Sequence, residues 1–224
     1  MNVATVDHGN TNPHVGLFSN DQLTKVISLN EFLELDHHHF KKVISSVGKR
    51  ELIQRIDGIY INQFFKEKHF LSMPVHYSET LGQDRLACSY YAFKKYSNQR
   101  VLILDIGTFF TADLVTENGL EGGYIFPGLR LSNDLYKNGA QLSSVDNLNE
   151  ITSSSLAHTT SDAIKNALHL QFEAIVKELE TRVNPDLILI TGGQSHFLEK
   201  FTRAKTLADK ELIHHALYEI FKSL

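Results

Sequence analysis

Two short motifs place a carboxylate, a glycine and a hydroxyl residue at the end of an apolar strand. They are DHGNT at residues 7–11, after a strand predicted over Met1 to Val6, and DIGT at residues 105–108, after a strand over Val101 to Leu104. In such a turn the glycine lets an oxyanion approach the backbone, N–H groups and hydroxyls donate to it, and the carboxylate can hold a cation. One Asp-x-Gly is usually only a turn. Two copies, each after an apolar strand and before a hairpin, indicate a duplicated domain with phosphate-facing turns.

A third motif, GQDR at residues 82–85, stands at the start of a helix predicted over Gln83 to Tyr96. In phosphoryl transfer, a carboxylate such as Asp84 can orient the acceptor hydroxyl and take its proton. The planar fork of Arg85 suits the carboxylate or amide of a substrate. The alternative is that Asp84 is only a favourable charge at a helix N-terminus and Arg85 a surface residue.

The elements around these motifs predict an α/β protein with two similar halves. In the first half, strands at Leu23 to Leu29 and Lys42 to Val47 follow the hairpin. The second half repeats the plan with three strands from Val101 to Phe126, in which Glu117-Asn118-Gly119 is a hairpin turn. The polar break at Ser97-Asn98-Gln99 separates the halves, so we place the domains at residues 1–99 and 100–224.

Helices are predicted between and after the strands of the second half. A long one runs from Ser161 to about Arg182, with Ser161 or Thr160 as its N-cap, and a strand at Leu187 to Ile190 then leads to TGG at residues 191–193. The main apolar stripe of the long helix consists of Ile164, Leu168, Phe172, Ile175 and Leu179. Further apolar residues lie outside it, namely Ala163, Ala167, Leu170 and Val176. We also predict a short helix at Lys49 to Ile56 and a polar loop at Ser143 to Ser155.

Composition is that of an ordinary globular chain: 224 residues, 42% hydrophobic and 21% charged. The net charge of −4 does not favour binding to nucleic acid or to an anionic membrane. A single cysteine, Cys88, excludes an internal disulfide and fits a reducing compartment. With no signal peptide and no long apolar run, the sequence predicts a cytoplasmic protein.

In order and approximate spacing, five segments resemble the motifs of the type III pantothenate kinases, in the actin-like and sugar-kinase ATPase superfamily. They are DHGNT at 7–11, GQDR at 82–85, DIGT at 105–108, GGYIFPG at 122–128 and TGG at 191–193. The resemblance spans nearly the whole chain. It implies two ribonuclease-H-like domains with ATP in the cleft between them. It also implies transfer of the ATP γ-phosphate to the 4′-hydroxyl of pantothenate, the first step of coenzyme A biosynthesis.

The resemblance further implies a role for individual residues. Asp84 is the expected proton acceptor and Asp105 the ligand of a monovalent cation, K⁺ or NH₄⁺. Independently of the resemblance, a carboxylate facing ATP phosphates usually binds Mg²⁺, which is the role expected of Asp7. The expected pantothenate-binding residues are Tyr77, Gly82, Gln83, Asp84, Arg85 and Thr160. The expected ATP-binding residues are Asp7, His8, Gly9, Asn10, Thr11, Asn12, Pro13, His14, Thr108, Gly192 and Gly193. The resemblance also implies a homodimer that pairs through the second domains.

The chain departs from the family pattern at Phe109, which follows DIGT, at Ala167, and at Gln194 after the double glycine. Two rival interpretations stay open. One is a related small-molecule kinase with another hydroxyl acceptor, because only the shape of the pocket selects the acceptor. The other is a catalytically silent regulatory homologue, against which the retained carboxylates Asp84 and Asp105 argue.

Overall fold

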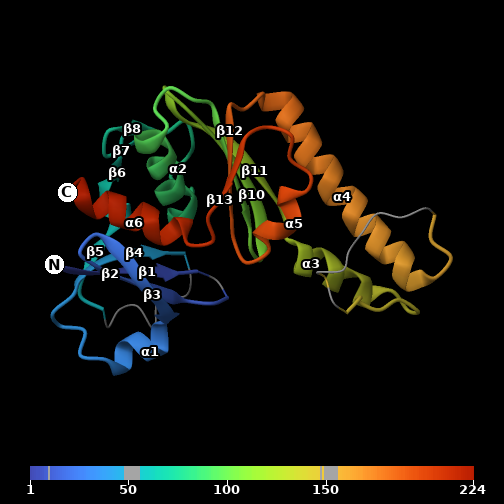
Figure 1. Cartoon of the computed structure of the whole chain (residues 1–224), viewed down its shortest axis with the longest axis horizontal. Coiled ribbons are helices and arrows are strands. Elements are labelled where there is room, and N and C mark those ends of the chain that lie inside the picture. The colour runs from blue at the N-terminus through green and yellow to red at the C-terminus, as the bar shows by residue number, and fades with distance from the viewer. Residues whose placement is uncertain (10, 48–55, 147, 149–155) are drawn as a thin grey trace. The chain divides into compact units, whose positions relative to one another are not determined.

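The structure is a computed structural model that describes residues 1–9, 11–47, 56–146, 148 and 156–224 (Figure 1). The predicted helix at 49–56 and much of the predicted loop at 143–155 lie outside these residues. The chain divides into two compact units, residues 1–98 with 115–122 and 211–224, and residues 99–114 with 123–210. These units differ from the predicted division in that 115–122 and 211–224 belong with the first half.

The first unit is built on a five-stranded mixed sheet in the order β3-β2-β1-β4-β5. Strand β1 pairs antiparallel with β2 and parallel with β4, and its central residues are buried, as expected for a strand covered on both faces. The bounds are β1 (Asn2–His8), β2 (His14–Ser19), β3 (Gln22–Ser28), β4 (Lys41–Ser46) and β5 (Ile59–Tyr60).

Helices cover both faces of this sheet. Helix α1 (Leu29–Glu34) contributes Leu29 and Phe32 to an apolar core with β1, β2 and β4. On β1 and β4 lie α6 (Leu212–Lys222) and α2 (Gln83–Lys95), which pack against each other (Figure 1). The remaining elements are the 3₁₀ helix η2 (Ile61–Phe64) and a small sheet of β6 (Phe65–Lys66), β7 (His69–Phe70) and β8 (Met73–Pro74).

The second unit repeats the strand order of the first, with the sheet β11-β10-β9-β12-β13. Strand β12 pairs parallel with both β9 and β13. The bounds are β9 (Val101–Ile106), β10 (Phe109–Thr116), β11 (Gly119–Pro127), β12 (Leu187–Thr191) and β13 (Thr206–Ala208). The hairpin turn predicted at residues 117–119 lies between β10 and β11, where Gly119 has a φ of +104°. The two mixed sheets confirm the predicted α/β duplication.

The helices of the second unit are α3 (Leu129–Asp134), the 3₁₀ helix η3 (Leu135–Asn138), α4 (Thr160–Val183) and α5 (Ser195–Glu199). The predicted stripe of α4 packs into the core through Ile164, Leu168 and Phe172. Val176, which we had predicted outside that stripe, also lies in this core. No helix in the described ranges is long and apolar enough to cross a membrane.

The predicted N-cap of α4 is wrong by one residue. Thr159 has extended backbone angles, and its Oγ1 accepts a hydrogen bond from the backbone N of Asp162 at 3.2 Å. Thr160 is the first helical residue, and its side chain is exposed. The run Thr159-Thr160-Ser161 offers three hydroxyls that can cap a helix, and the position of Asp162 selects the first.

Candidate functional site

In the first unit, the DHGNT motif lies where β1 ends beside β4. Asp7 and His8 are in register with Ser45 and Ser46 of the parallel strand, and Val47 N donates to His8 O at 3.1 Å. The buried imidazole of His8 also contacts Ser46 Oγ at 3.1 Å. Thr11 and Asn12 are exposed, Gly9 and Pro13 are half-buried, and Asn10 lies outside the described residues.

Across the β1–β2 hairpin, Asp7 is paired with His14. The distance from His14 Nε2 to Asp7 Oδ2 is 3.6 Å. Burial lowers the pKa of His14, so its imidazole is neutral near pH 7. This hairpin therefore combines a carboxylate, a neutral imidazole and a hydroxyl-bearing loop.

A hydrogen bond ties the GQDR motif to the end of β4, the strand that pairs in parallel with β1. Gln83 Oε1 accepts from the backbone N of Ser46 at 3.0 Å, which ties the start of α2 to the end of β4. Gly82 is the N-cap of α2, and a Cβ there would lie 2.5 Å from Asp84 Oδ1. A side chain at position 82 would therefore displace the Asp84 carboxylate.

Asp84 and Arg85 differ in their surroundings. The half-buried Asp84 accepts a hydrogen bond at Oδ1 from the backbone N of Arg85 at 2.8 Å, as expected in the first turn of a helix. Arg85 is only 8% exposed, and its guanidinium lies 5.0 Å from the ring centroid of Tyr77. The alternative in which Arg85 is a surface residue is therefore wrong. Two residues predicted to bind substrate are in contact.

In the second unit, DIGT and TGG meet at the carboxyl ends of neighbouring parallel strands. Asp105 is in register with Thr191, and Gln194 N donates to Ile106 O at 3.4 Å. Gly192 has a φ of +90°, and a Cβ there would lie 2.5 Å from Asp105 Oδ1. This close approach explains why the turn beside Asp105 needs a glycine.

The FPG segment at residues 126–128 packs against the same turn. Gly128 N donates to Thr108 O at 3.0 Å, and a Cβ on Gly128 would lie 2.2 Å from Gly107 O. The side chains of Thr108 and Phe109 are exposed here. The structure thus brings together three segments of the second unit that are far apart in the sequence.

Sequence reasoning did not select His214, in the C-terminal helix α6. Its Nε2 lies 2.9 Å from His14 Nδ1, and its Nδ1 lies 2.8 Å from Thr5 Oγ1. It is fully buried. The one signal in the sequence is Gly16, a glycine inside a strand, which often marks a close approach of another group.

The described residues contain no group of three or more histidine, cysteine, aspartate or glutamate side chains that could hold a metal ion. Mg²⁺ in nucleotide sites is commonly bound by only one or two carboxylates together with phosphates and water. A single carboxylate at Asp7, with exposed hydroxyl and amide residues after it, fits such a magnesium site.

The fold is shared with solved kinases. A ROK family glucokinase from Streptomyces griseus superposes with a TM-score of 0.56 at 10% identity, over 98% of this chain and 99% of that one. With two similar mixed sheets, the chain thus has the fold of this kinase.

The sequence comparisons are more specific. The type III pantothenate kinase family model matches residues 43–182, and the chain belongs to this family. A type III pantothenate kinase from Flavobacterium psychrophilum is 25% identical over 98% of each chain. Another, from Campylobacter hominis, is 28% identical over 92% of this chain and 93% of its own.

Proposed function

We propose that this protein transfers the γ-phosphate of ATP to the 4′-hydroxyl of pantothenate, the step that opens coenzyme A biosynthesis, in the cytoplasm. The observation that carries the proposal beyond family membership is the anchored GQDR turn. Gln83 fixes it beside the Asp7 hairpin, and Arg85 is held against Tyr77. These contacts support a proposal in which Asp84 serves the acceptor hydroxyl, Arg85 binds the anionic end of the substrate, and the Asp7 loop binds phosphate.

In this proposal Asp84 orients the 4′-hydroxyl and accepts its proton as the bond to phosphorus forms. The guanidinium of Arg85, with Tyr77 and Thr160, binds the polar ends of pantothenate, and Gly82 and Gln83 shape the turn around it. Holding both reactants in line contributes a large part of the rate, because the loose transition state demands little covalent chemistry from the protein.

ATP phosphates are bound by the loop from Asp7 to His14 and by Thr108, with Gly192 and Gly193 on the nucleotide side. Asp7 is the proposed ligand of the Mg²⁺ that neutralises phosphate charge. Asp105 is the proposed ligand of a monovalent cation, K⁺ or NH₄⁺. Exposed backbone and hydroxyl groups at these turns are the donors that such a site needs.

An ADP-release assay coupled to pyruvate kinase and lactate dehydrogenase tests the proposal directly. We expect ADP release that depends on added pantothenate, with phosphopantothenate detected by mass spectrometry. Release with another small hydroxyl compound and none with pantothenate would show a related kinase with a different acceptor. Absence of release with every acceptor, in protein that still binds ATP, would show a silent homologue.

The monovalent cation leads to a separate prediction. Replacing NaCl by KCl at constant ionic strength should raise kcat severalfold, because K⁺ at Asp105 offsets the phosphate charge. The Asp105→Asn variant should be slow in both salts. Because the pyruvate kinase of the coupled assay itself requires K⁺, phosphopantothenate is measured directly by mass spectrometry in both salts. Equal wild-type rates of its formation would reject the cation assignment.

We also propose that the chain is a homodimer in which α4 forms part of the interface. Leu170 is 65% exposed, and Ala163 and Ala167 are exposed on the same helical face. An apolar helix face that its own unit leaves exposed favours burial against a second copy. A twofold pair would use this face on both subunits.

Light scattering at micromolar concentration should therefore give about twice the 25.4 kDa chain mass. Leu170→Glu should give monomers, because it places a charge in the centre of the apolar face. Leu35→Glu is the matched control, since Leu35 is also exposed (45%) but belongs to the first unit. A wild-type monomer with full pantothenate-dependent activity would contradict the proposal.

A further inference from the structure

A chain of four polar side chains connects the C-terminal helix to the proposed phosphate hairpin. Thr5 Oγ1 is 2.8 Å from His214 Nδ1, and His214 Nε2 is 2.9 Å from His14 Nδ1. His14 Nε2 in turn faces Asp7 Oδ2 at 3.6 Å. All four residues belong to the first unit. This series of side chains ends at Asp7, whose carboxylate we assign to magnesium and phosphate binding.

The sheet is shaped to admit the His214 ring. Gly16 lies opposite Thr5 in the β1–β2 ladder, and a Cβ there would approach His214 Cγ to 2.7 Å and its Nδ1 to 2.8 Å. Any side chain at position 16 would therefore displace this imidazole. A glycine in the middle of a strand weakens the strand, so its presence here has a local reason in the space that His214 occupies.

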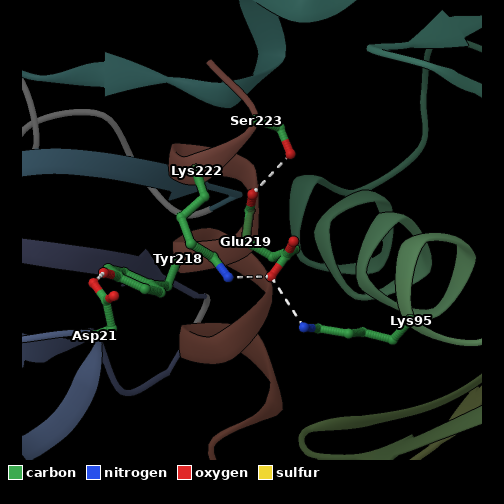
Figure 2. Close-up of polar contacts among 6 residues, drawn as sticks. All are labelled: Asp21, Lys95, Tyr218, Glu219, Lys222 and Ser223. Atoms are coloured by element: carbon green, nitrogen blue, oxygen red, sulfur yellow. Dashed lines mark hydrogen bonds and ion pairs between the residues drawn. The ribbon is translucent and has the colours of Figure 1, made fainter.

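The helix that carries His214 is fixed to the first unit at its other end (Figure 2). Tyr218 Oη donates to Asp21 Oδ1 at 2.5 Å, and burial together with this bond raises the pKa of Tyr218 to about 12. Glu219 Oε2 forms ion pairs with Lys95 Nζ of α2 at 3.4 Å and with Lys222 Nζ at 2.7 Å. The position of His214 therefore follows from contacts that do not involve the hairpin.

The Asp7 carboxylate determines which ring nitrogen of His14 and of His214 carries the proton. An ionised carboxylate only accepts hydrogen bonds, so the favourable neutral form of His14 has its proton on Nε2, toward Asp7. His14 Nδ1 is then an acceptor and requires a proton on His214 Nε2. Thr5 Oγ1 has one proton and two acceptors within reach, His214 Nδ1 at 2.8 Å and Gly16 O at 3.2 Å. In the arrangement that the carboxylate favours, this proton is directed to His214 Nδ1. Both imidazoles are then neutral and in the Nε2–H form, with two hydrogen bonds along the series and the His14 Nε2–H facing Asp7 Oδ2 at 3.6 Å.

We propose that His214 is a positioning residue that fixes the ring and tautomer of His14, and thereby holds the Asp7 carboxylate in its nucleotide-binding orientation. The inference rests on the proposed function, because Asp7 has its role only if the hairpin binds nucleotide. It assigns to the C-terminal helix a part in the phosphate site, which lies some two hundred residues away in sequence.

Two substitutions of His214 separate its contact with His14 from its contact with Thr5. Glutamine places its amide near the position of the imidazole Nε2, so His214→Gln keeps a donor toward His14. Asparagine places its amide near Nδ1, so His214→Asn keeps a partner for Thr5 but loses the link to His14. Tyr218→Phe is the control on the same helix, because it removes the bond to Asp21 and leaves the His14 side untouched.

Three measurements on the full-length chain follow. Long-range ¹H–¹⁵N spectra of the nucleotide-free protein report which ring nitrogen of each histidine carries the proton. Calorimetry with ADP and Mg²⁺ gives the dissociation constant, and the ADP-release assay gives kcat and KM for ATP. Loss of a group that orients a metal-binding or catalytic residue typically costs about 10–100-fold.

We expect Nε2–H forms for both histidines in the wild type and a mixed tautomer for His14 in His214→Asn. That variant should bind Mg²⁺-ADP at least about tenfold more weakly. His214→Gln should retain most of the affinity, and Tyr218→Phe should lower the melting temperature only. An Nδ1–H form of His14 in the wild type would overturn the proposal. Equal losses in both His214 variants would also overturn it, because they indicate a packing role.

Failure of the proposed function would look different. Wild-type protein without pantothenate-dependent ADP release would remove the assignment of pantothenate as the acceptor, while the tautomer and ADP-binding results would still support or overturn the role of His214. A wild type that binds no Mg²⁺-ADP would overturn both, since the hairpin would then have no nucleotide to orient.

Discussion

Replacing Asp84 by asparagine is expected to lower kcat by about 10²–10⁴-fold, the usual contribution of a general base. Asparagine has nearly the same shape and keeps an oxygen that can accept the 2.8 Å hydrogen bond from Arg85 N. The start of α2 should therefore survive, and ATP binding should stay close to that of the wild type. Coupled ADP release and calorimetry with nucleotide measure the two effects separately.

The control for this variant is a carboxylate in the first turn of another helix. Glu31 occupies that place in α1, and its side chain pairs with Lys25 at the surface. Glu31→Gln should cost at most about 1 kcal/mol of stability and leave kcat unchanged. If Asp84→Asn behaved like Glu31→Gln, Asp84 would be a helix-terminal charge and some other group would take the proton.

The local pattern predicts the central strands of both five-stranded sheets and the turns that end them, but not the short edge strands β5 and β13. A buried strand that delivers Asp7 or Asp105 to a glycine turn is encoded within about a dozen residues, by an apolar run followed by a breaker. The repeated strand order follows from the duplication of that signal. Gly192 could also be found, because a double glycine after a buried strand indicates a close approach of backbone.

Contacts between distant segments could not be predicted in this way. The C-terminal helix belongs with the first unit because Tyr218 and Glu219 contact Asp21 and Lys95, and no local pattern encodes such partners. For the same reason the contact of Arg85 with Tyr77 was not predicted, since the resemblance assigned each residue separately to the substrate site, and His214 was missed. The cap of α4 was misplaced for a different reason, since adjacent hydroxyls such as Thr159 and Thr160 have similar capping propensity.

The second large effect is expected at Gly192. Alanine there would place its Cβ 2.5 Å from Asp105 Oδ1 and 2.6 Å from Ile106 O, in a residue with a φ of +90°. A left-handed backbone costs a non-glycine residue about 1–2 kcal/mol, and overpacking against fixed atoms typically adds about 1–3 kcal/mol. We therefore expect Gly192→Ala to lower the free energy of unfolding by roughly 2–5 kcal/mol.

Its neighbour Gly193 provides a control that differs by one residue. A Cβ on Gly193 meets no atom within 4 Å, and its φ is outside the left-handed region. Gly193→Ala should therefore leave the stability unchanged or raise it by up to about 1 kcal/mol, through the loss of freedom in the unfolded chain. Urea denaturation, monitored by circular dichroism, gives the free energy of unfolding of both alanine variants and of the wild type.

The two alanine variants also test whether the turn at residues 192–193 fixes the position of the Asp105 carboxylate. If Gly192→Ala still folds, its Cβ can be accommodated only by moving Asp105 or the backbone at Ile106. The variant should then lose the activation by K⁺ that we expect of the wild type. Equal stability of the two alanine variants would mean that the 192–193 turn relaxes freely. Asp105 would then owe its position to β9 alone, and the glycine at 192 would have to be explained by the approach of a ligand.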